Sequence, residues 1–369
     1  MCIDSYARTH ASGFLSVGRD GSDARAGNNT SMASSARAGG CTTPRCCQRH
    51  PRSCAPSRGE DDAAAVSAAT RVLRNAAAWP RGDLAVSHTN AGNLQFARNW
   101  WHHLRAAGVD NFALLATDDA AYAALQHELP SRSVRLPHSI FAARDAGSNH
   151  NQYRSKGWTK LMFAVPLMVK FVLGAGLDVL WMDTDVVALS NPFPLIHAQL
   201  HELSRQGGGT VGSGSTLIAS VDGRVPEEDL TECGRAYSAS ARWGSSAGGW
   251  KLCGGLFYLQ HGRASAAFLD EWERRLHGPG AGAKNQPHYN EALRTKASGL
   301  TLRLLPCDLF PNGFRYASEP WRRAQSRAPV LVHNNWIKGH DAKVARFQRW
   351  GMWRAEANGT HAGIRDAPG

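Results

Sequence analysis

An apolar run that ends in two carboxylates is the feature that most constrains how this chain folds. Residues 177–182, LDVLWM, are followed directly by Asp183, Thr184 and Asp185. A short run rich in branched and aromatic residues, with glycines just before it, predicts a buried β-strand. Side chains two residues apart on an extended chain share a face, about 6–7 Å apart. Asp183 and Asp185 can therefore converge on one cation at the edge of a sheet.

Paired carboxylates of this kind hold hard cations such as Mg²⁺ or Mn²⁺, which in turn bind diphosphate groups. An Asp-x-Asp triplet alone is equally typical of solvated acids at a junction between a strand and a turn. The apolar strand in front of the triplet and Asn191-Pro192-Phe193-Pro194 behind it favour the metal site.

Strands and helices alternate from residue 80 onward, which predicts an α/β fold with a mixed, mostly parallel sheet flanked by helices. Ligands bind at the carboxyl ends of parallel strands. A predominantly apolar stretch at 161–175 is too short to span a membrane and predicts a buried helix under the sheet. Strands are predicted at 84–87, 112–116, 134–136, 177–182, 216–219, 252–259, 302–309 and 330–333, and helices at 93–107, 119–129, 158–173, 263–277 and from 286 onward.

Polar residues occupy the ends of two of these strands, beside the Asp183 pair. Thr89 and Asn90 follow the strand at 84–87, and Asp118 follows the strand at 112–116. A nucleotide base and ribose would fit at this edge. The same residues are equally well explained as N-caps of the helices that follow them, so both interpretations stay open.

A histidine and a lysine near the C-terminal end add to the predicted site. His333 ends the strand at 330–333, where a neutral imidazole is a plausible further ligand for an octahedral ion. Lys338, five residues later in a loop, would neutralise phosphate oxygens that the metal leaves bare. A core histidine bonded to the backbone and a solvated surface lysine are the alternatives.

Composition divides the chain unevenly. Residues 1–78 are rich in Ser, Ala, Gly and Arg and predict a disordered arm, followed by a folded domain at 79–355 and a tail at 356–369.

The formal charge of +12 raises nucleic acid as a partner. Because the basic residues are scattered and no nucleic-acid-binding motif accompanies them, we expect no such partner. Cys233, Cys253 and Cys307 in the folded part allow one disulfide with one thiol left over.

Five segments in a fixed order resemble one family of enzymes. Together they are similar to the nucleotide-diphospho-sugar transferases of plants and green algae, glycosyltransferase family 77, which includes rhamnogalacturonan-II xylosyltransferases and extensin arabinosyltransferases. The resemblance covers about residues 82–354. The segments are Asn99-Trp100-Trp101, Asp183-Thr184-Asp185, Cys253-Gly254-Gly255-Leu256-Phe257, Gln286-Pro287-His288-Tyr289-Asn290 and His333-Asn334-Asn335-Trp336-Ile337-Lys338-Gly339-His340-Asp341-Ala342-Lys343.

The resemblance implies a GT-A-like fold, a UDP-sugar donor, Mn²⁺ or Mg²⁺ as cofactor, and transfer with retention of configuration to a cell-wall polysaccharide or glycoprotein. By the same resemblance, Asp183 would lie near the ribose and the metal, Asp185 and His333 would bind the metal, and Lys338 with Gly339 would contact the diphosphate. The family's membrane anchor is not visible in this chain, so residence in the Golgi lumen is an expectation from the resemblance alone.

Other roles and other functions remain open from the sequence. Gln286 and Asn290 are candidates for holding the transferred sugar, although either residue is also a plausible helix cap. The tryptophans at 243, 250 and 321 are candidates for stacking on acceptor sugars, with core packing as the more general explanation. A haloacid-dehalogenase-like phosphohydrolase, in which Asp183 would be phosphorylated, and a non-catalytic sugar-binding protein of the same fold are the alternative functions.

Overall fold

The computed structural model describes nine stretches of the chain. They are residues 58–78, 80–141, 149–150, 155–206, 215–222, 236–237, 251–279, 284–294 and 300–355. The chain divides into two units, residues 1–61 and 62–369. All residues that line the candidate site belong to the second unit.

Eight strands of the second unit form one sheet. They are β1 (Asp83–Thr89), β2 (Phe112–Ala116), β3 (Ser133–Arg135), β4 (Asp178–Met182), β6 (Thr216–Asp222), β7 (Ala236–Tyr237), β8 (Lys251–Leu259) and β9 (Thr301–Leu304). Their order is β3-β2-β1-β4-β8-β6-β9-β7. The pairs β1–β2, β2–β3, β1–β4 and β6–β9 are parallel, while β4–β8, β6–β8 and β7–β9 are antiparallel. The predicted mixed, mostly parallel sheet is therefore confirmed.

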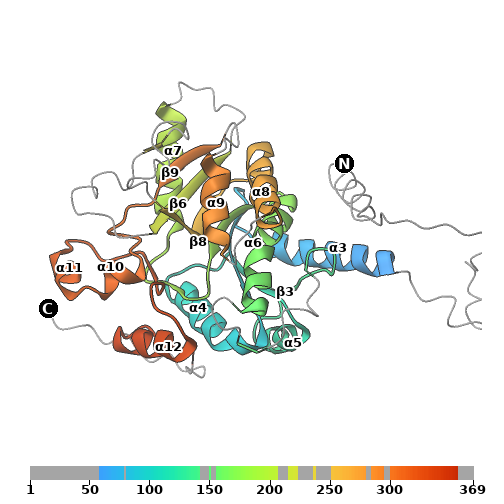
Figure 1. The fold of residues 1–369 in the computed structure, drawn as a ribbon, viewed down its shortest axis with the longest axis horizontal. Coiled ribbons are helices and arrows are strands. Elements are labelled where there is room, and N and C mark those ends of the chain that lie inside the picture. Colours follow the sequence, from blue (N-terminus) through green and yellow to red (C-terminus); the bar gives the residue numbers. More distant parts are fainter. Residues whose placement is uncertain are drawn as a thin grey trace, which may run out of the picture. The chain divides into compact units, whose positions relative to one another are not determined.

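Both faces of the sheet are covered, which explains why β4 is apolar from Val179 to Met182. Val179 and Trp181 pack into one core cluster, and Leu180 and Met182 pack into another on the opposite face. Side chains of α6, α8 and α9 join the first cluster, and side chains of α4, α5 and α7 join the second. The helices α6, α8 and α9 lie close together (Figure 1). The helices are α4 (Leu94–Ala106), α5 (Asp119–Glu128), α6 (Lys156–Gly174), α7 (Phe193–Gln206), α8 (Arg263–Leu276), α9 (Asn285–Arg294), α10 (Gly313–Ala317), α11 (Glu319–Ala324) and α12 (His340–Arg349).

Helix α6 confirms the buried helix predicted at 161–175. In the described part of the chain, α6 is the one helix whose length and composition would suit a membrane span. Half of its most apolar 18-residue stretch is buried inside the protein. Leu161, Val165 and Met168 pack into the first core cluster. Their burial explains the apolar composition of α6 as that of a core helix.

Two sequence predictions about the fold were wrong in part. Helix α3 (Arg58–Ala76) lies within the range predicted as a disordered arm, and its Ala69, Leu73 and Ala76 are buried in the core. Spacings of four and three residues place them on one helical face, although small alanines dilute the pattern. The rest of the predicted arm, 1–57, and the predicted tail from 356 onward lie outside the described residues.

The strand predicted at 302–309 ends much earlier. Strand β9 stops at Leu304, and after the bond from Leu305 N to Ala219 O, the chain turns at Pro306, whose carbonyl accepts from Leu309 and Phe310. Proline cannot donate to a strand ladder, so it ends the strand. Of the three cysteines predicted in the folded part, Cys307 is disulfide-bonded and Cys253 is a buried free thiol, whereas Cys233 lies outside the described residues.

The histidine at the end of β1 predicts an acid-sensitive fold. His88 stacks on Trp181 with ring centroids 5.6 Å apart, and its Nδ1 has no hydrogen-bond partner among the described residues. Burial lowers the pKa of His88 from 6.5 to about 4. Between pH 6.5 and about pH 4, His88 is protonated in the unfolded chain but not in the folded protein. The free energy of unfolding therefore falls as the pH falls through this range.

We expect His88 to contribute a loss of about 1 to 2 kcal/mol between pH 7 and pH 5. Urea unfolding of the wild type and of His88→Gln at both pH values measures this loss. The wild type should lose more stability than the variant on acidification, and equal losses would contradict the prediction.

Candidate active site

The two aspartates lie on a tight turn between β4 and a short strand, β5 (Val186–Ala188). Val186 N donates to the carbonyl of Asp183 at 3.0 Å, which closes the turn. Asp183 N donates to Gly255 O at 2.7 Å, which fixes the turn against β8. The apolar β4 thus carries both carboxylates to the edge of the sheet.

A second strand pair brings His333 to this turn. Strand β10 (Leu331–His333) pairs antiparallel with β5, and the register places His333 opposite Val186. The bond from Asn334 N to Asp185 O, 2.8 Å long, continues the contact. Because β5 begins directly after Asp185 and β10 ends at His333, the pairing delivers the imidazole to the two acids.

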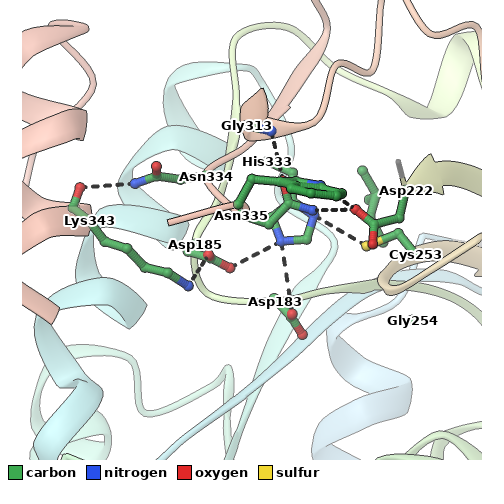
Figure 2. Close-up of polar contacts among 12 residues, drawn as sticks. Asp183, Asp185, Asp222, Cys253, Gly254, Gly313, His333, Asn334, Asn335 and Lys343 are labelled. Atoms are coloured by element: carbon green, nitrogen blue, oxygen red, sulfur yellow. Dashed lines mark hydrogen bonds and ion pairs between the residues drawn. The ribbon is translucent and has the colours of Figure 1, made fainter. Parts of the chain in front are cut away.

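The three side chains form one compact cluster (Figure 2). His333 Nε2 lies 3.3 Å from Asp185 Oδ1 and 4.0 Å from Asp183 Oδ2. One potential ligand atom from each residue lies within 4.8 Å of the others. On the other side of the ring, Nδ1 is 3.4 Å from Cys253 Sγ. The cluster contains the metal ligands predicted from the sequence.

A lysine that the sequence analysis did not assign completes the cluster. Lys343 Nζ lies 2.5 Å from Asp185 Oδ2, and the side chain of Asn334 donates to the Lys343 carbonyl at 2.9 Å. Lys343 comes from α12, so the loop after His333 folds back onto the site. Its place in the resembling segment was the only sequence signal for it.

Each charged group of the cluster shifts the pKa values of its neighbours. Burial, followed by the neighbouring Asp185 charge, raises the pKa of Asp183 to about 6. Burial opposes ionisation of Asp185, but Lys343 and His333 outweigh it and hold the Asp185 pKa well below its usual value. Burial disfavours the charged form of His333, whereas Cys253 and Asp185 favour it and raise the His333 pKa well above 6.5. Two carboxylates and an imidazole are therefore held together largely by opposite charge.

The wall opposite the acids has no room for a side chain. A Cβ at Gly255 would lie 2.2 Å from Asp183 Oδ2 and 3.1 Å from His333 Cε1. Glycine in a strand often marks a place where another group approaches the backbone closely. The donor set of two carboxylates with one imidazole fits a divalent ion such as Mn²⁺ or Mg²⁺.

A cavity of about 1630 Å³ surrounds the cluster. Of the residues predicted to bind the metal, the nucleotide or the transferred sugar, all but Asp118 line it. Those that line it are Thr89, Asn90, Asp183, Asp185, Gln286, Asn290, His333, Lys338 and Gly339.

Asp118 has a structural role instead. Its Oδ1 accepts from Ala121 N at 2.8 Å and its Oδ2 accepts from Ala91 N at 2.9 Å. Both oxygens are therefore occupied in capping α5 and holding the loop after β1, which is the capping interpretation. Asp118 is not among the residues that line the cavity, and its role in nucleotide binding stays a prediction.

Asn290 is likewise held by the backbone. It is 4% exposed, its Oδ1 accepts from Leu252 N at 2.8 Å, and its Nδ2 donates to Leu252 O at 2.9 Å and Gln286 O at 2.9 Å. These contacts brace β8 against α9, and the role of Asn290 in sugar binding stays a prediction.

We expect Asn290→Ala to lower the free energy of unfolding by about 1 to 3 kcal/mol, because it leaves two buried backbone groups of Leu252 unpaired. Chemical denaturation measures the loss, and donor affinity of the folded variant measures the alternative role. A stable variant with weakened donor binding would support the sugar-binding assignment.

Asp222 is a functional candidate that the sequence analysis missed. Its Oδ2 accepts from Gln286 Nε2 at 2.6 Å, and its Oδ1 accepts from Asn335 Nδ2 at 3.1 Å and Trp336 Nε1 at 2.7 Å. It lines the cavity at the end of β6. Because it is the last residue of an apolar strand, it carries the same signal that identified Asp183.

The tryptophans predicted as sugar-stacking candidates are not seen in that role. Trp243 and Trp250 lie outside the described residues. Trp321 packs edge-on against Tyr316 with ring centroids 6.5 Å apart, and it is not among the residues that line the cavity.

Comparison with known proteins places the chain in a family. A family model described as nucleotide-diphospho-sugar transferase matches residues 107–347. UDP-D-xylose:L-fucose alpha-1,3-D-xylosyltransferase 3 of Arabidopsis thaliana is 25% identical over 268 residues, which cover 70% of this chain and 63% of that protein. UDP-galactose:fucoside alpha-3-galactosyltransferase of Dictyostelium discoideum is 24% identical over 221 residues, covering 56% of this chain and 30% of that protein. The chain thus spans less than two thirds of the length of these two relatives.

Among solved structures, the galactosyltransferase LgtC in complex with donor and acceptor sugar analogs matches at 15% identity with a TM-score of 0.41, covering 75% of this chain and 96% of that chain. The family match covers more than half of the 369 residues and includes the cluster of Asp183, Asp185 and His333. It agrees with the GT-A-like expectation and disfavours the phosphohydrolase alternative. The chain belongs to the nucleotide-diphospho-sugar transferase family.

Proposed function

We propose that this protein is a metal-dependent glycosyltransferase that moves a sugar from a UDP-sugar donor to a carbohydrate acceptor. The observation that carries the proposal is the cluster of Asp183, Asp185 and His333, whose ligand atoms lie within 4.8 Å of one another on the wall of the cavity. In a nucleotide-diphospho-sugar transferase, such a cluster suits a divalent ion that binds a diphosphate.

Different residues of the cavity would bind different parts of the donor. Asp183, Asp185 and His333 would hold Mn²⁺ or Mg²⁺, and a bound ion would stabilise the charge that develops on the departing diphosphate. Lys338 and Gly339 line the same cavity and would contact the phosphate oxygens, while Thr89 and Asn90 at the end of β1 would contact the nucleoside. Gln286, held by Asp222 and by Gly254 N at 3.3 Å, would position the transferred sugar.

Retention of configuration is part of the proposal, and front-face attack is the route that the carboxylates favour. The acceptor oxygen would bond to the anomeric carbon on the side from which UDP leaves, and the hydroxyl proton would pass to the departing phosphate oxygen. A double displacement would need a free carboxylate as nucleophile. The carboxylates among the described lining residues all have partners: Lys343 and His333 hold Asp185, His333 faces Asp183 at 4.0 Å, three donors hold Asp222, and Arg275 and Arg294 flank Glu291.

The acceptor and the compartment are proposed from the relatives. The names of both relatives above specify an L-fucose or fucoside acceptor, which favours a fucose-containing polysaccharide or glycoprotein. A further relative at 23% identity, Beta-arabinofuranosyltransferase RAY1 of Arabidopsis thaliana, leaves pentose transfer among the activities to be tested. We propose action in the Golgi lumen, as the family resemblance implies.

UDP release from a panel of UDP-sugars tests the proposal. The full chain should release UDP from at least one of UDP-xylose, UDP-galactose and UDP-arabinofuranose in Mn²⁺, and the release should stop in EDTA. Phosphate release from p-nitrophenyl phosphate should stay at the background rate. Metal-independent turnover, or phosphatase activity without UDP release, would overturn the assignment.

A further inference from the structure

The cavity is larger than one donor requires. Pockets for a single small ligand are typically about 300–1,000 Å³, whereas this cavity measures about 1630 Å³. The cluster of Asp183, Asp185 and His333 lies on a buried wall of the cavity, where Asp185 is 6% and His333 4% exposed. Since the donor diphosphate belongs at the cluster, the exposed part of the cavity is available for the second substrate.

An exposed tryptophan lies on that more open part. Trp336 lines the cavity and is 50% exposed, and Phe314, 41% exposed, lies beside it with ring centroids 5.8 Å apart. Among the residues that the structure describes, only Leu189 is another large apolar side chain with comparable exposure. Adjacent exposed aromatic rings at a ligand cavity are a feature of binding surfaces.

Contacts with other residues of the site fix the positions of Trp336 and Phe314. Trp336 Nε1 donates to Asp222 Oδ1 at 2.7 Å, and Asp222 in turn accepts from Gln286. Gly313 N donates to Asn335 Oδ1 at 2.7 Å, and a Cβ at Gly313 would lie 2.1 Å from Asn335 O, so these neighbouring backbones touch. Both rings are therefore positioned before any ligand binds.

The backbone of Trp336 is also unusual. Its φ is 60°, and it is the one non-glycine residue in the described part of the chain with a positive φ. A bulky residue rarely adopts this conformation, and such residues concentrate at ligand-binding and catalytic sites. The half-exposed indole thus extends from a backbone conformation that a bulky residue rarely adopts.

We propose that Trp336, with Phe314 beside it, is the platform on which the acceptor sugar ring stacks during transfer. The apolar face of a pyranose or furanose ring suits an exposed indole, and the polar groups of Asp222 and Gln286 lie next to the platform to receive ring hydroxyls. The uracil base is the other flat ligand of the reaction, but the nucleoside is assigned to the end of β1. This inference rests on the proposed glycosyltransferase function and adds the position of its acceptor.

Direct saccharide binding tests the platform. Methyl α-L-fucopyranoside, methyl β-D-galactopyranoside and methyl α-L-arabinofuranoside are titrated into the full chain with UDP and Mn²⁺, and the dissociation constant is measured by calorimetry or saturation-transfer NMR. Trp336→Ala should raise the dissociation constant of the bound glycoside about tenfold, as expected for loss of one stacked ring. Trp336→Phe, which also loses the bond to Asp222, should stay within about threefold of the wild type. Trp321→Ala, a tryptophan outside the cavity lining, should match the wild type.

The outcomes separate this inference from the proposed function. If the wild type releases UDP from no donor, the glycosyltransferase proposal fails whatever Trp336 does. If it releases UDP, the platform alone is overturned by any of three results: unchanged glycoside affinity in Trp336→Ala, no binding of any of the three glycosides to the wild type, or a loss of UDP affinity equal to the loss of glycoside affinity. The last result would place Trp336 in the donor site.

Discussion

Asp185→Asn is expected to abolish metal-dependent sugar transfer, with a fall in kcat/KM on the order of 10³-fold. Asp185 is the most constrained carboxylate of the cluster, because Lys343 contacts one of its oxygens and His333 the other. These two cations hold its pKa well below the usual value, so it is ionised at neutral pH. Asparagine keeps the size of the side chain but removes the charge that a divalent ion needs.

Isothermal titration of UDP in the presence and absence of Mn²⁺ checks this directly. The wild type should bind UDP more tightly with the metal, and Asp185→Asn should show no metal enhancement. Asp341→Asn makes the same substitution at a fully exposed position of α12 and should behave as the wild type does.

Because Asp185→Asn breaks a buried ion pair, its fold is verified by circular dichroism, and Asp185→Glu serves as a second variant. Glutamate keeps the charge but moves the carboxylate by one methylene, so metal enhancement should still fall. A folded Asp185→Asn protein with undiminished Mn²⁺-dependent binding would falsify the metal-ligand role.

Gly255→Ala should lower kcat/KM by about 100-fold without a change in any charged group. The added Cβ would lie 2.2 Å from Asp183 Oδ2, so the carboxylate must move away from the position that faces His333. Displacement of a positioned group by about 1 Å is enough for a loss of this size.

The neighbouring glycine provides a matched control in the same strand. A Cβ at Gly254 has Trp272 Cζ2 as its nearest contact, at 4.0 Å, which is ordinary van der Waals distance. Gly254→Ala should therefore leave activity within about threefold of the wild type. Equal losses in both variants would show that the effect comes from strand stability and not from Asp183, and thermal unfolding of the two proteins would reveal this.

Local patterns predicted most of the fold. The strands β1, β2, β4, β8 and β10 and the helices α4, α5, α6 and α8 lie within a few residues of their predicted ranges, because each is a distinct apolar run or amphipathic segment bounded by turn residues. Helix α3 was missed because alanines gave its buried face little contrast. The strand predicted at 302–309 is longer than β9, because Pro306 interrupts a sequence that is otherwise largely apolar.

The candidate site was predicted unevenly for a physical reason. Residue type and position at the end of an apolar strand were enough to predict Asp183, Asp185 and His333 as metal ligands. The structure brings these three side chains together. Asp222 also ends an apolar strand, so a local pattern could have identified it. Lys343 carries no such pattern, and its contact with Asp185 joins residues 158 positions apart.

The amino-acid sequence by itself determined the strands that end in acids and a histidine, and therefore the kind of ion and ligand that this edge of the sheet can attract. Only the tertiary structure decided how those groups are used. The pairing of β5 with β10 sets His333 against the aspartates, and backbone contacts occupy Asp118 and Asn290. Residue type and periodicity depend on neighbours along the chain, whereas the partner of a polar atom depends on which distant strands pair.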